Sequence, residues 1–545
     1  MADAKGQGQR AAEAGRAAAA IALELDPRLA EEAFERVLAA DPLDAISRLA
    51  LAQLKTDRGD LAAAEADAAR AFAEAVEQTA KALAAFALGE IALARGRKAE
   101  AKNAFAASHD LFEAILKSDP GDYDALRHHA RACQRLAEFT VVESGAALGR
   151  LAHAEALTVL ETLSEREDAK LDLAEDLALG CARLAALSVE LGDLESAEKC
   201  AEACVGWRLR LADGEPDVAA WREDLAAAYE AQAAVELLTR RYLQARESCD
   251  RAIKLRVGIA AAAPHDARRR RLLAASWRLS AQCAARVEEW AHAKNAAAQA
   301  RALAERDGSE AGVKALYTAL LLEGDIALKA HDLEGARQAF AQACEFAQSH
   351  VERDPEWTPL LAAAWERLGD VGAAAARHAG ARDAFARARA LLGASDKKAD
   401  ARLSLKAGEA ALAAGDRDGA RTAFTQSCSV RLALVEASPN DFKLARDLAV
   451  GMERIGLLAQ SAGDKKLARA AWRDELKIAD ALMVATPRDE AAIRFCAIVH
   501  AHIVTLEETD MHAHRADAFA LLDQLEAMGK LSENDKALRA RLERA

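Results

Sequence analysis

The stretch WERLGDVGAAAARHAGARDAFARA, residues 365–388, decides the fold of this chain. Its spacing is W-x2-L-G followed by A-x3-F-x2-A, at Trp365, Leu368, Gly369, Ala381, Phe385 and Ala388. Residues three or four apart lie on one face of an α-helix, so each half predicts one helix with a buried stripe. Gly369 and Ala381 are small enough to let the two helices pack closely. We therefore predict a helical hairpin here, with Phe385 filling the space toward the next hairpin.

The same order of small and large residues recurs along most of the chain. The matching glycine and aromatic positions are Gly89 with Phe105, Gly324 with Phe340, Gly408 with Phe424 and Gly456 with Trp472. The alanines that correspond to Ala381 are Ala30, Ala64, Ala101, Ala152, Ala197, Ala245, Ala293, Ala336, Ala420 and Ala468. The first interval is 34 residues, and those after Ala197 run from 39 to 48. A glycine inside a helix costs about 1 kcal/mol, so its recurrence at one position implies a packing reason that an arbitrary alanine-rich bundle lacks. We predict an all-α fold, an α-solenoid of about eleven stacked hairpins.

One copy of the hairpin departs from this frame. Between residues 121 and 167 the pattern is weakest, and Gly145 and Gly149 blur its register. The best candidates for the second helix of this copy are Ala152, Ala156 and Val159. We expect a distortion of the array at this point.

The end of the chain also differs from the repeats. After Pro487 the pattern fades, and three helices are expected to begin near Glu490, Asp510 and Ser532. The last is rich in charge, which suits a cap over the exposed end of a solenoid. The predicted parts are residues 1–120 with N-terminal hairpins, 121–167 with a degenerate hairpin, 168–487 with extended-period hairpins and 488–545 with capping helices.

On these residues the chain resembles the tetratricopeptide repeat (TPR) family over roughly residues 11–486. The longer-period half is similar to the extended variant of kinesin light chains and of many bacterial arrays. The match departs at Gly372, where the family usually has tyrosine, and at Glu475, where a small residue is expected. The resemblance implies a right-handed superhelix whose concave face, formed by the first helices, binds peptides or protein domains. It also implies an adaptor or scaffold and not an enzyme.

Composition and charge limit the class of partner. The net charge is −14, which argues against general affinity for nucleic acid or for anionic membranes. Hydrophobic residues make up 52% of the chain but aromatic residues only 4%, so the apolar content is mostly alanine and leucine, and no stretch is long enough to span a membrane. The nine cysteines are odd in number and irregularly spaced, which favours a reducing, cytoplasmic compartment over a disulfide framework. Family style and composition favour a bacterial protein.

The repeat frame also predicts which side chains face the groove. They are Arg183, Arg278, Gln282, Arg286, Lys406, Glu453, Arg454 and Gln460. Several are basic despite the acidic total, so the groove would suit an acidic peptide or a C-terminal carboxylate. For any single one of them, an ordinary solvated helix face is the simpler alternative. No full set of positions like those of chaperone-tail-binding TPR clamps is present.

Three clusters invite a chemical interpretation that their spacing does not support. His500, His502, His512 and His514 have i, i+2 spacings, which point in different directions on a helix, so a solvated helix–turn–helix is favoured over a metal site. Cys200 and Cys204 share a helical face, but Cys204 stands at a small core position. The run of four arginines, residues 268–271, has no interleaved aromatics and is best explained as a solvated helix start, with an acidic protein partner as the alternative. No catalytic, metal or cofactor residue is predicted.

We therefore expect a protein–protein interaction scaffold that binds a peptide or protein partner, without nucleic acid or membrane insertion. Two alternatives remain open. One is a peptide-gated regulator that changes its curvature when a ligand binds. The other is an enzyme built from helical hairpins, which would need a catalytic cluster or metal facing one cavity.

Overall fold

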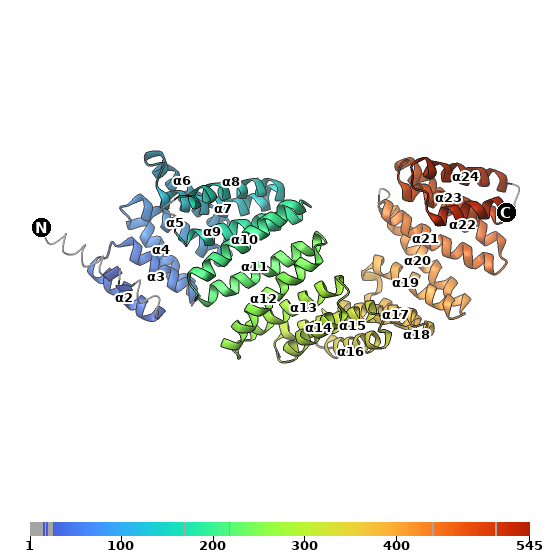
Figure 1. Cartoon of the computed structure of the whole chain (residues 1–545), viewed down its shortest axis with the longest axis horizontal. Coiled ribbons are helices and arrows are strands. Elements are labelled where there is room, and N and C mark those ends of the chain that lie inside the picture. Colours follow the sequence, from blue (N-terminus) through green and yellow to red (C-terminus); the bar gives the residue numbers. More distant parts are fainter. Residues whose placement is uncertain are drawn as a thin grey trace. The chain divides into compact units, whose positions relative to one another are not determined.

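The protein is all-α, as predicted (Figure 1). The computed structural model describes residues 15–16, 18–19, 26–166, 170–216, 218–438, 441–506 and 510–544, in which 24 α-helices, one short 3-10 helix and no strand occur. Within these ranges no helix is both long and apolar enough to span a bilayer. The chain forms two compact units: the first ends at Val287 and the second begins at Glu288.

The first unit holds twelve of these helices. They are α2 (Pro27–Ala40), α3 (Ala45–Asp57), α4 (Leu61–Glu74), α5 (Gln78–Ala94), α6 (Lys98–Ser118), α7 (Tyr123–Ser144), α8 (Ala146–Ser164), α9 (Leu173–Glu190), α10 (Leu194–Gly214), α11 (Ala219–Leu238), α12 (Tyr242–Ala262) and α13 (Ala267–Arg286). Within the unit, each packs against the helices next to it in sequence, and α3, α5, α7 and α9 also contact one another in order. The first helices of successive hairpins therefore share a face in this unit.

The second unit holds the other twelve. They are α14 (Trp290–Glu305), α15 (Glu310–Lys329), α16 (Leu333–Val351), α17 (Trp357–Ala374), α18 (His378–Leu392) with the 3-10 turn Gly393–Ser395, α19 (Lys397–Ala413), α20 (Arg417–Ala437), α21 (Phe442–Ser461), α22 (Lys465–Ala485), α23 (Glu490–Val504), α24 (Met511–Ala527) and α25 (Glu533–Arg544). Ten hairpins lie wholly within one unit or the other, from α3–α4 to α11–α12 and from α15–α16 to α23–α24. The expected stacking of hairpins in sequence order is confirmed within each unit.

Each helix-interior glycine of the repeat makes room for the aromatic ring sixteen residues later. A Cβ atom on Gly369 would lie 2.6 Å from Cε1 of Phe385, and the other four pairs are equally close. The ring therefore packs on the glycine of its own hairpin. It also reaches the next one, as predicted: Phe340 clusters with Val371 of α17, and Phe424 with Leu458 of α21. Glycine and aromatic residue are thus one packing unit, which the spacing alone did not show.

A turn of three residues joins the helices of most hairpins, and its middle residue has a left-handed backbone. Five of these middle residues are glycines: Gly59, Gly96, Gly192, Gly415 and Gly463. At the same position of other turns stand Arg240, Glu288, His331 and Ala376, which are the positive-φ residues other than glycine in the described ranges. A side chain at positive φ is strained, whereas glycine adopts this conformation freely.

We expect Ala376→Gly to raise the free energy of unfolding by about 0.5–1 kcal/mol, because it relieves the left-handed strain at φ 56°. Thermal and urea denaturation of the full chain measure the change. Ala375→Gly is the matched control, since Ala375 is in the same turn but has φ −86°. That control should lower stability, and a loss of stability in both variants would contradict the strain argument.

The weak copy between residues 121 and 167 is a full hairpin with an unusually short turn. Gly145 alone joins α7 to α8, at φ 90°. Counted from the start of the second helix, Gly149 takes the place of Ala101, and His153 takes the place of Phe105. Ala152, Ala156 and Val159, our candidates for the second helix of this copy, all lie on α8, but the small position of the frame belongs to Gly149 and not to Ala152. His153 is 2% exposed and fills the aromatic position of this hairpin.

The C-terminal helices begin close to the expected residues, at Glu490, Met511 and Glu533. Leu542 of the charged α25 is buried in a cluster with α23 and α24. Arg494 of α23 binds Asp535 of α25 at 3.0 Å. The division of the chain at residues 120, 167 and 487 stays a prediction.

Candidate partner-binding site

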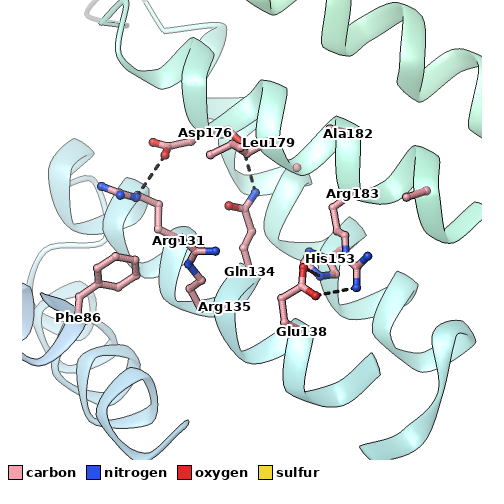
Figure 2. Close-up of a pocket in the computed structure, with 12 residues that line it drawn as sticks. Phe86, Arg131, Gln134, Arg135, Glu138, His153, Asp176, Leu179, Ala182 and Arg183 are labelled. Carbon is pink, nitrogen blue, oxygen red and sulfur yellow. Dashed lines mark hydrogen bonds and ion pairs between the residues drawn. The ribbon is translucent and has the colours of Figure 1, made fainter. Parts of the chain in front are cut away.

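A pocket of about 390 Å³ opens on the shared face of α5, α7 and α9 (Figure 2). We call it the α7 pocket. Its lining residues are Phe86, Arg131, Gln134, Arg135, Glu138, His153, Asp176, Leu179, Gly180, Ala182, Arg183 and Ala186. All but His153 come from the first helices of three successive hairpins. Its size is that of a site for a few side chains of a ligand.

Helical spacing aligns the lining residues along the pocket. On α7, Arg131, Arg135 and Glu138 follow one another at intervals of four and three residues, which keeps them on one face. On α9, Asp176, Leu179 and Arg183 repeat this arrangement, so the two helices present polar groups to each other across the pocket.

Each arginine of the pocket has a carboxylate on a neighbouring helix. Arg135 binds Glu90 of α5 at 2.6 Å, and Arg183 binds Glu138 of α7 at 2.7 Å. Arg131 lies 3.3 Å from Asp176 and 5.0 Å from the ring centre of Phe86, over which it stacks. The three arginines are therefore balanced by three carboxylates, of which Glu90 lies beside the lining. The pairs of Arg135 and Arg183 are half-exposed and worth little energy, so an incoming carboxylate can replace Glu90 or Glu138 at low cost, whereas Asp176 is buried.

The floor of the pocket combines a buried histidine with small residues. His153 Nε2 lies 3.3 Å from Glu138 Oε1 (Figure 2), and both ring nitrogens of His153 are buried without a well-formed hydrogen bond. Burial raises the pKa of Glu138, but the side chains of His153 and Arg183 beside it outweigh burial, and the net pKa is lowered. Glu138 is therefore held as a carboxylate. Leu179, which is 48% exposed, forms an apolar rim.

The structure brings one of the eight predicted groove residues, Arg183, into this pocket. The other three of the first unit, Arg278, Gln282 and Arg286, lie on α13 at intervals of four residues.

The remaining four residues lie in the second unit, where they form ion pairs or hydrogen bonds with other side chains of this protein. Lys406 of α19 binds Glu366 at 2.9 Å and Asp370 at 2.8 Å. On α21, Arg454 binds Glu409 at 3.1 Å and the neighbouring Glu453 lies 3.6 Å away, while Gln460 donates to Thr505 at 2.7 Å. Their role in binding a partner stays a prediction.

Sequence analysis missed Arg131, Arg135 and Glu138, although their spacing on α7 is visible. The short turn at Gly145 concealed the register of this hairpin, so its first helix was not aligned with the others.

The clusters set aside in the sequence are placed as follows. Arg268 and Arg269 both bind Glu223 of α11, so the arginine run is partly engaged within the chain. Burial raises the pKa of Cys200 and Cys204, as fits core thiols. The expectation of solvated histidines was wrong for His502, which stacks on Trp472 and whose pKa burial lowers to about 4.

Comparison with known proteins gives structural likeness only. No protein-family model matches the chain, and no curated protein does. Similar solved structures include the apo form of RapI, with 14% identity, a TM-score of 0.48 and coverage of 72% of this chain and 98% of that one. They also include BtubC (BKLC) from P. vanneervenii, with 16% identity, a TM-score of 0.36 and coverage of 44% and 90%. The C-terminal part of a TPR repeat-containing protein from Cytophaga hutchinsonii has 13% identity, a TM-score of 0.29 and coverage of 53% and 94%. The TPR resemblance rests on the hairpins themselves.

Proposed function

We propose that this protein is an interaction scaffold that binds a peptide or a protein segment through the shared face of its first helices, at the α7 pocket. The observation that carries the proposal is the pocket itself. Three arginines, two carboxylates and an exposed leucine converge there from two neighbouring hairpins, and Phe86 adds an aromatic ring from a third. A constellation of charged and apolar groups in a concave site is what recognition of a peptide requires.

The chemistry of the pocket favours a ligand with a carboxylate next to an apolar side chain. Arg135 and Arg183 offer planar guanidinium groups, which bind a carboxylate through two parallel hydrogen bonds. An apolar side chain would cover Leu179, Ala182 and Ala186. An acidic segment or a C-terminal carboxylate has both features. The odd number of irregularly spaced cysteines supports a reducing, cytoplasmic location for this scaffold, and we propose no catalytic activity.

Arg183→Glu is expected to abolish partner binding, because it replaces the attracting charge and repels Glu138. The full chain and the variant are used to capture proteins from an extract of the native host, and the captured proteins are quantified by mass spectrometry. Arg210→Glu is the matched control, since Arg210 is an exposed arginine on α10 of the same unit. The same proteins captured in equal amounts by all three chains would contradict the proposal.

A further inference from the structure

The hairpin α23–α24 brings two histidines and one aspartate together at distances that suit a metal ion. Nδ1 of His500 on α23 lies 2.9 Å from Nδ1 of His514 on α24, and 3.9 Å from Oδ2 of Asp517. The three possible ligand atoms all lie within 4.8 Å of one another. His514 and Asp517 are three residues apart and share a face of α24, which is turned toward His500.

The three groups differ in exposure in a way that allows an ion to enter. His500 is 7% exposed and anchors the cluster in the core of the second unit. His514 is half-buried, and Asp517 is exposed. A donor set of this kind has a rigid inner ligand and a mobile outer one, so an ion can be taken up from solvent without unfolding the hairpin.

We propose that His500, His514 and Asp517 bind a divalent transition-metal ion, and that Zn²⁺ fits the donor set best. Two imidazole nitrogens and one carboxylate oxygen leave a fourth tetrahedral position for water. In a tetrahedral site with bonds of about 2.0–2.1 Å, neighbouring ligand atoms are about 3.3 Å apart. The nitrogen pair would therefore open by about 0.4 Å, and the aspartate oxygen would approach by about 0.6 Å. Rotations of the exposed side chains of α24 supply both movements.

Groups around the cluster support the same assignment. Oδ2 of Asp510 lies 3.7 Å from Nε2 of His514, and Arg473 of α22 holds this carboxylate at 2.9 Å. A carboxylate behind a metal-bound imidazole orients the ring and keeps the proton on the outer nitrogen. Asp480, which is exposed, and the buried Cys496 form a second group of possible ligands with His500. The ion would link α23 to α24, the last hairpin before the C-terminal helix α25.

The competing explanation is a hydrogen bond between two neutral imidazoles without an ion, and direct binding measurements separate the two. The full chain, freed of any affinity tag and stripped with a chelator, is titrated with Zn²⁺ against a chromophoric competitor. Co²⁺ is used as a spectroscopic probe, because its visible bands report a tetrahedral site of nitrogen and oxygen ligands. We expect one Zn²⁺ per chain at this site.

Two variants and one control decide the result. His514→Ala and Asp517→Ala should each lower the affinity at least about 10-fold, since loss of a group that only supports a ligand already costs that much. Asp517 is exposed, so its variant keeps the fold even if the histidine variant does not. His512→Ala removes an exposed histidine from the same helix and should leave binding unchanged.

Among the described residues, one further group of possible metal ligands does not include His500. It consists of His109, His129 and Cys133 in the first unit. Co²⁺ bound there would show a thiolate-to-cobalt charge-transfer band that Cys133→Ser removes, so occupancy of that group is counted separately. Equal Zn²⁺ affinity and stoichiometry in the native chain, Asp517→Ala and His512→Ala would overturn the proposal.

Discussion

Replacing Gly369 with leucine is expected to destabilise the second unit by about 3 kcal/mol, which is a large part of the stability of a typical domain. A Cβ atom at this position already lies 2.6 Å from the ring of Phe385, so the ring must leave its place. Phe385 is 2% exposed and belongs to a cluster that includes Leu403 of the next hairpin. The loss therefore spreads to α19. Circular dichroism during thermal and urea denaturation should show a lower transition midpoint and less helix.

Two further variants test whether the collision with the ring is the cause. Gly380→Leu changes a glycine of the same hairpin that has no atom near its missing Cβ, and leucine is the better helix former. It should raise stability by about 0.5–1 kcal/mol. Gly369→Leu combined with Phe385→Ala should be less harmful than the sum of the single changes, because the leucine can occupy the vacated volume. Strict additivity would mean that glycine and ring do not act together.

The repeating hairpins could be predicted because their cause is local. A helix-interior glycine is costly unless something packs on it, so its recurrence before an aromatic residue marked each contact, as at Gly324 and Phe340. The starts of the C-terminal helices could be predicted because capping residues and prolines mark them. The register of α8 could not, because Gly149 and His153 stand where the other hairpins have an alanine and an aromatic residue.

The candidate site was harder to predict, because it depends on contacts between hairpins. The arginine at position 183 was expected to face the groove, and it does line the α7 pocket. Its partner Glu138 is 45 residues away, and no spacing within one helix points to it. The contact between His500 and His514 was not predicted for the same reason. Within each helix their spacing is wrong for a metal, but the packing of α23 on α24 sets His500 opposite His514.

The departure from the repeat at Glu475 has a consequence for stability. This residue occupies a position where a small side chain is expected, and it is 1% exposed on α22, with Oε2 making no hydrogen bond. Burial, with a smaller contribution from the nearby Glu453 on α21, raises the pKa of Glu475 to about 8. The native protein therefore holds this side chain as a neutral acid at pH 7. The unfolded chain does not, because an exposed glutamate has a pKa of about 4.3.

The stability of the second unit is expected to fall as the pH rises from about 4.5 to about 8. In that window the native state binds one proton more than the unfolded state, so each pH unit costs up to about 1.4 kcal/mol, and the loss levels off above the native pKa. Glu475→Gln mimics the neutral acid at every pH and removes this dependence. At pH 8 the variant should be more stable than the native chain by about 2–4 kcal/mol, and near pH 4.5 the two should be alike.

The difference between the two chains isolates this residue, because other groups titrate equally in both. His502, whose pKa burial lowers to about 4, adds a contribution of opposite sign: stability rises as the pH increases from about 4 to about 6.5. Urea denaturation at several pH values between 4.5 and 8.5 measures the difference in unfolding free energy. Glu436→Gln, at an exposed position of α20, is the control, and its unfolding free energy should depend on pH in the same way as that of the native chain. A Glu475→Gln variant that behaves in the same way too would show that the buried carboxyl is ionised in the native protein. An ionised carboxyl at this buried position would need a neighbouring cation. The charged neighbour that the described residues provide is Glu453, which is an anion.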